Sequence, residues 1–202
     1  MKKLQLHFFS YLINSWSQND QKIWLQQNKY NLGLSYFKKK QYTNAIEPLL
    51  FAYKINPESE IGKKSKSKID ILKPIVRENL INKIIGTWNL SGNELISICR
   101  DPKSNKLNDT LMVITNQEIA YYVKNIKTKE MRLLKTDKIE FYDGFDTINS
   151  VTEMVNSENE LWTFIVDESL KGLRLIHTGN ATSSGRELID IDNKEAYYTR
   201  IK

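Results

Sequence analysis

The chain has 202 residues, of which 30 are lysine or arginine and 24 are aspartate or glutamate, so its formal net charge is +6. This mild basic excess does not indicate a nucleic-acid-binding protein, because a nucleic-acid groove needs clustered charge together with stacking aromatic rings. One cysteine excludes an intramolecular disulfide, and no run after the N-terminal segment approaches the roughly 20 apolar residues of a membrane-spanning helix.

The first predicted element is a signal peptide over residues 1–17. A basic start at residues 1–3 precedes a mostly apolar stretch over residues 4–13. Ser15 and Ser17 then place small residues at the third and first positions before a cleavage site, which is the anatomy of a secretory signal. The mature protein is therefore expected to be periplasmic or secreted. The alternative is a cytosolic chain with an amphipathic first helix.

Residues 18–84 carry the three- and four-residue spacing of apolar side chains that is typical of helices. We expect a helical hairpin over residues 26–59 and a third helix over residues 69–84. Pro48 predicts a small kink in the second helix of the hairpin. Pro74 predicts a kink in the third helix, or its division into two short helices.

Seven positions of the hairpin, Tyr42 among them, have the identities and spacing of one tetratricopeptide repeat (TPR), and the hairpin resembles one 34-residue unit of that family. In such a unit small residues let the two helix axes approach, apolar residues share a helical face, and a proline follows the second helix. Lys40 departs from the pattern, because it stands where a turn glycine is usual. The resemblance implies a structural role for Leu32, Gly33, Tyr36, Ala45, Ala52 and Pro57.

The same resemblance implies a partner-binding surface on the first helix, formed by Gln27, Tyr30, Leu34 and Phe37. Family members that clamp a terminal carboxylate use Lys and Asn at two of these positions, where this chain has Tyr30 and Leu34. The surface is therefore a candidate site for a protein partner, or it docks on the rest of the chain. The basic run over residues 62–68 contains no aromatic residue, and we interpret it as a solvated helix face.

From residue 85 onward the pattern changes to the alternation and β-rich runs that are typical of strands, with turn residues between them. About eight to ten short strands without intervening helices predict an antiparallel barrel or sandwich. The expected strands are Thr87–Ser91, Glu94–Arg100, Thr110–Thr115, Glu118–Lys124, Met131–Lys135, Lys138–Tyr142, Glu160–Val166, Gly172–Thr178, Glu187–Asp190 and Ala196–Ile201.

A Gly-x-Trp sequence, Gly86-Thr87-Trp88, opens this region. On a first strand, and with this number and size of strands, it resembles the lipocalin and wider calycin families. The resemblance implies that Trp88 closes one end of a barrel and that Arg200 packs over its ring. Such a contact contributes about 0.5–2 kcal/mol, so Gly86, Trp88 and Arg200 are expected to be structural. The whole layout resembles uncharacterised envelope proteins of bacteria.

Alternation predicts that nine apolar side chains point into this barrel. In the lipocalin family the ligand lies in the barrel interior, so these side chains are candidate contacts for a small apolar ligand. The alternative is that they fill a solid core. They are Leu95, Met112, Ile114, Tyr121, Phe141, Trp162, Phe164, Leu173 and Leu175.

Catalytic and cofactor motifs are missing from the sequence. No glycine pair has the spacing of a phosphate-binding loop or a dinucleotide fingerprint, zinc has no ligand set, and the acidic turn over residues 190–195 lacks the glycine of a calcium loop. An enzyme would have to build its site from His177 with a carboxylate such as Glu187 or Asp190. We therefore expect no cofactor, no metal and no enzyme activity.

Together these features predict an α+β protein with a TPR-like helical domain over residues 18–84 and a lipocalin-like antiparallel barrel over residues 85–202. The expected function is non-enzymatic binding in the bacterial envelope, with protein contacts through the helices and a small apolar ligand in the barrel. The alternative is a purely structural envelope module with a solid core and no ligand. Neither nucleic acid nor a membrane span is expected.

Overall fold

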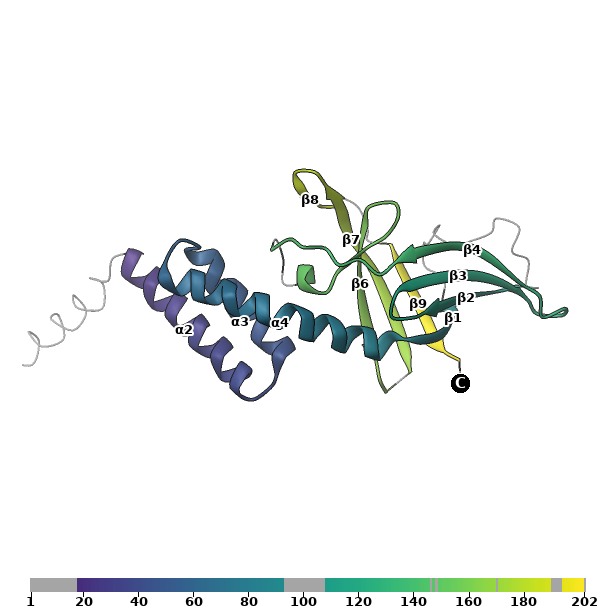
Figure 1. Ribbon diagram of the computed structural model, residues 1–202, viewed down its shortest axis with the longest axis horizontal. Helices are drawn as coiled ribbons and strands as arrows, with labels where there is room; N and C mark the ends of the chain where they lie inside the picture. Colours follow the sequence, from purple (N-terminus) through teal and green to yellow (C-terminus); the bar gives the residue numbers. More distant parts are fainter. Residues whose placement is uncertain are drawn as a thin grey trace, which may run out of the picture. The chain divides into compact units, whose positions relative to one another are not determined.

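The structure is a computed structural model that describes residues 18–92, 108–145, 147, 149–169, 171–189 and 194–201. These residues form three helices followed by nine strands in one antiparallel sheet, so the expected α+β class is confirmed (Figure 1). The expected signal peptide over residues 1–17, the expected strand Glu94–Arg100 with Leu95, and Asp190 lie outside the described residues.

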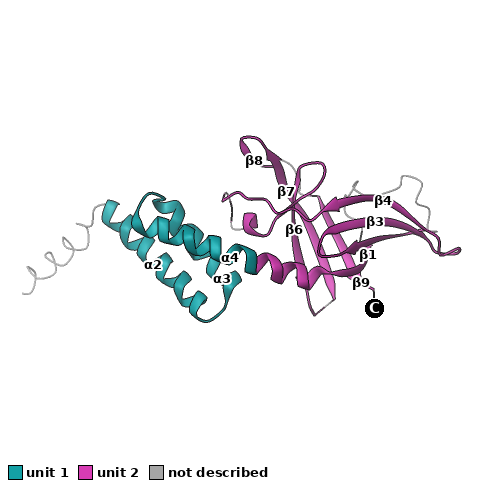
Figure 2. Cartoon of the chain, in the orientation of Figure 1, with its two compact units in different colours: residues 1–75 teal, residues 76–202 magenta. Residues whose placement is uncertain are grey.

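The chain divides into two compact units, residues 1–75 and residues 76–202 (Figure 2). We call the described part of the first the helical unit and that of the second the β unit. The division falls inside helix α4, whereas the sequence placed the domain boundary after residue 84. Helix α4 therefore contributes its first part to the helical unit and its last part to the β unit.

Two prolines lie inside helices of this chain. Pro48 is buried within α3, and Pro74 is exposed within α4. The predicted division of the third helix at Pro74 is wrong: α4 is one helix of 25 residues, and the buried Leu72 and Val76 anchor the turns on both sides of the proline. The helices are α2 (Gln18–Lys38), α3 (Tyr42–Ile55) and α4 (Glu60–Ile84).

The crossing of α2 and α3 depends on a glycine. Gly33 is buried, and a Cβ atom at this position would lie 2.5 Å from Leu49 Cγ and 3.4 Å from the carbonyl oxygen of Ala45. Ala45 and Ala52 are themselves fully buried. Because none of these three small residues holds the helices apart, Leu49 can pack directly against the backbone of α2.

Leu32 does not belong to this crossing, contrary to the expectation from sequence. Its side chain is 44% exposed, because it lies one residue, or about 100° of helical rotation, away from Gly33. The inner face of α2 contains Gln26 instead, seven residues before Gly33 and on the same side of the helix. Of the other expected structural positions, Tyr36 is half-buried and Pro57 is exposed.

Gln26 joins α2 to the end of α3. Its side-chain nitrogen donates to the carbonyl oxygens of Ala52 (2.8 Å) and Asn56 (2.9 Å). Its side-chain oxygen accepts a hydrogen bond from the hydroxyl group of Ser59 (3.0 Å). Because Gln26 is buried, these bonds satisfy an amide that has little access to water.

Helix α2 ends in a Schellman motif. The backbone amide of Gln41 donates to the carbonyl oxygen of Tyr36 (3.0 Å), and the amide of Lys40 donates to that of Phe37 (3.0 Å). Lys40 has a φ angle of 58°, the left-handed conformation in which glycine is usual. A lysine therefore occupies the turn position that the sequence marked as a departure from the repeat pattern.

One antiparallel sheet forms most of the β unit. Its strand order is β4-β3-β2-β1-β9-β7-β6-β5, with β8 paired to β7. The strands are β1 (Gly86–Gly92), β2 (Asn108–Ile114), β3 (Glu118–Asn125), β4 (Met131–Lys138), β5 (Met154–Val155), β6 (Glu160–Asp167), β7 (Gly172–Thr182), β8 (Gly185–Glu187) and β9 (Glu195–Arg200).

Two predicted strands are wrong. Within the expected strand 138–142, the first residue ends β4 and Phe141 forms only an isolated bridge with Met154. The expected strand Glu187–Asp190 begins where β8 ends, because β7 extends to Thr182 and turns directly into β8. The sequence also missed β5, whose two residues are too few to show alternation.

The two ends of the strand order, β4 and β5, meet without a continuous ladder. Next to the bridge between Phe141 and Met154, the amides of Tyr142 and Val155 donate to the carbonyl oxygens of Glu153 and Glu140 (2.9 Å each). These contacts do not close the sheet into a barrel. The structure therefore establishes the antiparallel sheet and not the closed barrel.

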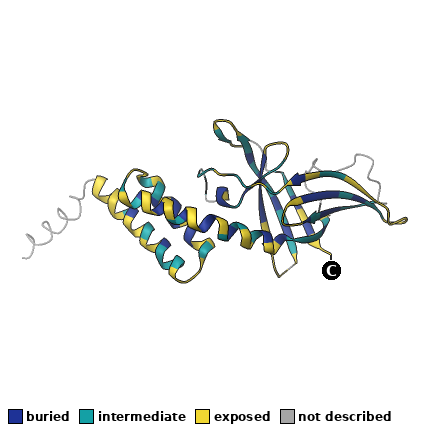
Figure 3. Cartoon of the chain, viewed as in Figure 1, coloured by how far each residue is buried: buried dark blue, intermediate teal, exposed yellow. Residues whose placement is uncertain are grey.

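A cluster of buried apolar side chains forms the core of the β unit, where the last part of α4 adds Ile81 and Ile84 to residues of the sheet. Figure 3 shows buried residues along the strands of this sheet. Trp88 of β1 is buried in this cluster, and its indole nitrogen donates to the carbonyl oxygen of Ile84 (2.7 Å). The guanidinium carbon of Arg200 lies 4.5 Å from the centroid of the Trp88 ring. The contact expected between these two residues is therefore present.

The backbone conformation of Gly86, beside this contact, is one that favours glycine. Its φ angle is 141°, and a Cβ atom there would lie 3.8 Å from the guanidinium group of Arg200. A side chain at this position would therefore be strained by the backbone conformation. Arg200 also donates to the carbonyl oxygen of Lys83 near the end of α4. Gly86, Trp88 and Arg200 thus join the end of α4 to β1 and β9.

Candidate functional site

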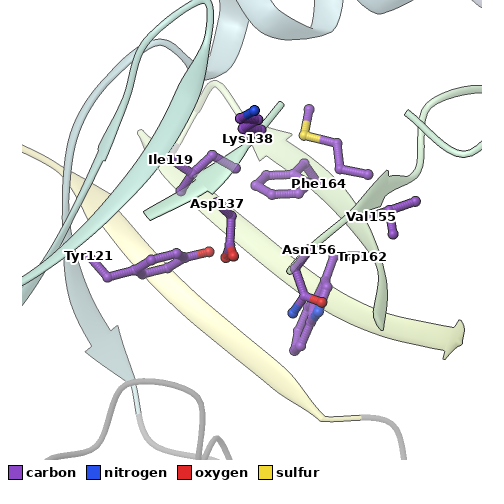
Figure 4. Close-up of a pocket in the computed structure, with 9 residues that line it drawn as sticks. Ile119, Tyr121, Asp137, Lys138, Val155, Asn156, Trp162 and Phe164 are labelled. Carbon is purple, nitrogen blue, oxygen red and sulfur yellow. The ribbon is translucent and has the colours of Figure 1, made fainter. Parts of the chain in front are cut away.

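Eight of the nine predicted ligand contacts lie in the described residues, and they pack together in the core of the β unit. Seven are buried, and Phe141 is half-buried. A cavity of about 20 Å³ lies beside them (Figure 4). It has room for about one water molecule, whereas small-molecule sites enclose roughly 300 Å³ or more. The eight are Met112, Ile114, Tyr121, Phe141, Trp162, Phe164, Leu173 and Leu175.

A buried carboxylate lines this cavity. Asp137 is 3% exposed, and its Oδ1 accepts hydrogen bonds from the amide (3.1 Å) and the hydroxyl group (2.6 Å) of Ser157. Its Oδ2 lies 3.2 Å from Lys135 Nζ. Since these partners connect the end of β4 to the turn before β6, Asp137 has a structural role in the described part of the chain.

A second polar cluster surrounds Glu160 at the start of β6. Its carboxylate accepts hydrogen bonds from Lys194 Nζ (3.0 Å), Asn156 Nδ2 (2.8 Å) and Trp162 Nε1 (3.2 Å). Burial raises the pKa of Glu160, but these hydrogen bonds and the charge of Lys194 together lower the pKa further than burial raises it. The group is therefore ionised at neutral pH and is a poor general acid there.

His177 is buried next to this cluster. Its ring stacks on Trp162, with ring centroids 5.0 Å apart and planes at 23°. Its Nε2 lies 3.3 Å from Asn180 Oδ1. In the described residues the polar partner of the ring is thus an amide and not the carboxylate that a catalytic site built on His177 would need.

Glu153 and Arg186 form a buried ion pair that the sequence analysis missed. Glu153 is 0% exposed, and it accepts hydrogen bonds from Thr178 Oγ1 (2.7 Å), Thr163 Oγ1 (3.4 Å) and the guanidinium group of Arg186. The guanidinium carbon of Arg186 also lies 5.7 Å from the centroid of the Tyr142 ring. The pair connects the residue before β5 to β8, and no local motif marks either partner.

On α2 the predicted partner surface is only partly exposed. Gln27 is exposed, and its side-chain nitrogen donates to Asn31 Oδ1 (3.0 Å). Tyr30, Leu34 and Phe37 are half-buried. Lys68 Nζ of α4 lies 4.9 Å from the centroid of the Phe37 ring, so α2 contacts α4 at Phe37 within the helical unit.

The two helices together present one surface that is apolar and carries lysines. Lys64 lies one turn before Lys68 on α4, and the hydrogen bond to Glu60 and the charge of Glu60 raise its pKa. Ile71 is 49% exposed one turn beyond Lys68. We call this surface the α2–α4 face; it consists of Tyr30, Leu34 and Phe37 of α2 with Lys64, Lys68 and Ile71 of α4.

A hollow of about 400 Å³ lies on α2 beside this face. Leu34 belongs to both, so the hollow continues the α2–α4 face along α2. Its remaining lining is polar or basic, and two of its side chains are lysines at the end of α2. The hollow is lined by Asn31, Leu34, Ser35, Lys38 and Lys39.

Comparison of the chain with protein-family models, with curated proteins and with solved structures finds no match. The TPR and lipocalin resemblances are therefore not tested by any relative. In the residues that the structure describes, no group of three or more His, Cys, Asp or Glu side chains could hold a metal ion. No described helix is long and apolar enough to cross a membrane.

Proposed function

We propose that this chain is a non-enzymatic interaction protein of the bacterial envelope, in which the α2–α4 face contacts a protein partner. The observation that carries the proposal is a difference in open space between the two units. The hollow on the helical unit has about 400 Å³, whereas the cavity beside the predicted ligand contacts has about 20 Å³. Leu34 of the helical unit is thus accessible to a partner, whereas the apolar side chains in the core of the β unit pack against one another.

The proposal treats the hairpin as a TPR-like unit. Its support is the close approach at Gly33, the buried Ala45 and the left-handed turn residue Lys40. A single repeat cannot bury both of its faces, and in this chain α4 covers one of them. The α2–α4 face lies at the edge of that cover, where Leu34 and Phe37 stay half-buried, and it is the surface that we assign to a partner.

The β unit is proposed to be a lipocalin-like barrel that serves as a packed scaffold. The contact between Trp88 and Arg200 and the bridge between Phe141 and Met154 support this proposal. The other role expected from sequence, carriage of a small apolar ligand, would require the packed side chains to separate well beyond the present cavity. A solid scaffold is therefore the better-supported role.

The envelope location is proposed from the expected signal peptide over residues 1–17. Protein isolated from the cells that make it should begin at Gln18, and mass measurement of its N-terminal peptide checks this. A chain that retains its first residues in the cytosol would contradict the location and leave the partner-binding role standing.

Site-specific photo-crosslinking tests the function directly. A photoreactive amino acid at position 34 should form a covalent adduct with a protein when cells are irradiated, because Leu34 lies in the hollow. The matched control is position 28, where Asn28 is exposed on the same helix but lies outside the α2–α4 face. Equal labelling at both positions, or none at either, would overturn the proposal.

Native mass spectrometry of the purified protein tests the carrier role. We expect the mass of the protein alone, because the cavity beside the core residues is too small for a ligand. A reproducible mass excess that disappears on denaturation would show that the β unit carries a small molecule and would make that role the main one.

A further inference from the structure

The basic residues of this chain are distributed unevenly between its two units. Residues 18–75 contain eleven lysines, no arginine and five acidic residues, which gives a net charge of +6. Residues 76–202 contain seventeen basic and nineteen acidic residues, which gives −2. The positive charge of the mature protein therefore belongs to the helical unit, and a partner of that unit meets a positive field.

Part of this charge is neutralised within α4 and its preceding turn. Lys64 pairs with Glu60 (2.6 Å) and Lys66 with Asp70 (2.8 Å), while Lys63 lies 3.4 Å from Glu58. These pairs are exposed, so each contributes little to stability. Because these three lysines already have acidic neighbours, a partner would find less unpaired positive charge on α4.

The lysines around the hollow are different. Among the described residues, no carboxylate lies within ion-pair distance of Lys38, Lys39 or Lys68. Lys38 and Lys39 line the hollow, and Lys68 lies against Phe37 on the α2–α4 face. Lysines in the last turn of a helix also complement its dipole, but that effect leaves their ammonium groups free to pair with a carboxylate.

We propose that the hollow and the adjoining α2–α4 face bind an acidic segment of a protein partner, whose carboxylates pair with Lys38, Lys39 and Lys68. An apolar side chain of that segment would contact Leu34 between them. This inference rests on the proposed function and adds the chemistry of the partner to it. Electrostatic complementarity of this kind raises the association rate and selects the partner.

Nucleic acid fits this surface less well than an acidic peptide. Residues 18–75 contain no arginine, the residue that binds phosphate in a bidentate manner. Binding of single strands also needs aromatic rings that are open to stacking. The ring of Phe37 is already in contact with Lys68, and its centroid lies 5.9 Å from that of Tyr42. The exposed rings of the helical unit, Trp24 and Phe51, do not line the hollow.

A membrane surface also fits less well. Helices that lie on a lipid surface place their apolar residues on one outward face. Here Leu34 and Phe37 are half-buried, and the exposed apolar residues of α2, Ile23, Trp24 and Leu32, are spread over about 180° of the helix with the polar Asn28 and Asn31 among them. A narrow peptide can reach half-buried side chains such as Leu34 more readily than a flat bilayer can.

Peptide binding to the purified full chain tests the inference. The probe is a short fluorescent peptide of alternating glutamate and leucine, read by fluorescence anisotropy at low salt. We expect binding that weakens about tenfold or more as salt is raised. Replacing glutamate by lysine in the peptide should abolish binding, and replacing leucine by serine should weaken it.

Two protein variants with the same loss of charge locate the site. The double substitution Lys38→Gln with Lys39→Gln removes two positive charges from the hollow and should weaken binding about tenfold. Lys22→Glu lowers the net charge by the same two units on an exposed residue of α2, and it should change affinity less than about twofold. Circular dichroism checks that both variants keep their helices.

Equal weakening by the two variants, or equal binding of the glutamate and lysine peptides, would overturn the inference. Binding of anionic lipid vesicles or a single-stranded oligonucleotide through Lys38 and Lys39, without binding of the acidic peptide, would also overturn it. A crosslink at position 34 with no affinity for the acidic peptide would overturn only the partner chemistry. The proposed function would then remain.

Discussion

The helical unit and the β unit handle charge in opposite ways. Where α2 meets α3, the helical unit buries a neutral amide, Gln26, and it leaves most of its lysines exposed, with Lys73 as a buried exception. The β unit buries carboxylates, among them Glu153 and Glu160, and surrounds each with donors from its own chain. These buried charged groups of the β unit are thus paired within the fold, whereas the lysines around the hollow of the helical unit are available to a partner.

The comparison shows where function should be sought in this chain. A buried charge costs desolvation energy. When all of its partners belong to the same chain, it has no free position at which to bind a ligand. An exposed lysine without an acidic partner costs little and can bind. Motifs drew attention to the interior of the β unit, but its buried carboxylates are already paired, and the open surface lies on the helices.

The largest predicted effect tests the buried ion pair of the β unit. Arg186→Met leaves the carboxylate of Glu153 buried without its main positive partner, so unfolding free energy should fall by about 3–5 kcal/mol. The measurement is chemical denaturation followed by tryptophan fluorescence, since Trp88 and Trp162 are both buried in the β unit.

An exposed pair in the same unit provides the control. Arg174 donates to Glu195 through two nitrogen atoms (2.9 and 2.5 Å), but the Arg174 side chain is half-exposed. Arg174→Met should therefore cost less than about 1 kcal/mol. Equal losses in the two variants would show that burial does not distinguish the pairs and would remove the basis of the comparison.

The next effect concerns the polar contact of the helical unit. Gln26→Leu leaves the carbonyl oxygens of Ala52 and Asn56 without their shared donor, so it should destabilise the helical unit by about 1–3 kcal/mol. Gln21→Leu changes the same residue type at an exposed position of α2, and it should have an effect within about 0.5 kcal/mol. Hydrogen exchange should localise the loss to α2 and α3; exchange that becomes equally fast in the sheet would contradict this localisation.

A smaller effect depends on pH. The pKa of Glu160 in the folded protein lies below its ordinary value of 4.5, so ionised Glu160 stabilises the fold above pH 4.5. That stabilisation is lost as pH falls through the folded pKa. Glu160→Gln should therefore be less stable than the parent at pH 7, and the difference should shrink in acid.

The helical unit supplies the contrast for this experiment. The pKa of Glu60 is also lowered, by its hydrogen bond to Lys64 and by the charge of Lys64, but Glu60 is fully exposed. Glu60→Gln should therefore leave the dependence of stability on pH nearly unchanged. Unfolding free energies measured between pH 3 and 7 check both variants, and identical curves for Glu160→Gln and the parent would contradict the role of Glu160.

Much of the local structure could be predicted from sequence because it depends on neighbours in the chain. Periodicity indicated the hairpin, the helix before the sheet and most strands. The close approach at Gly33 and the contact between Trp88 and Arg200 were expected from the residues that resemble known families, and both are present. Leu32 was misplaced, since spacing alone does not show which side of α2 meets α3.

The remaining features depend on residues far apart in sequence. Glu153 and Arg186 are 33 positions apart, and Gln26 meets Asn56 across 30, so no local pattern marks either contact. The bridge of Phe141 to Met154 involves too few residues to show a period. The hollow beside Leu34 was missed for the same reason: its unpaired lysines can be recognised only when the surrounding carboxylates are placed.

The smallest predicted effect separates backbone strain from charge at the end of α2. Lys40→Gly should stabilise the helical unit by roughly 0.5 kcal/mol, because it relieves the left-handed conformation of Lys40, and the greater freedom of glycine in the unfolded chain offsets part of the gain. Lys39→Gly removes the same charge at a residue without a positive φ angle, so it should destabilise instead. Thermal unfolding measures the stability of both variants.

If the two variants behave alike, the charge of these lysines and not the turn geometry controls the end of α2. In that case the positive charge at the end of α2 has a structural role of its own, and the presence of Lys39 beside the hollow would no longer favour binding to an acidic partner.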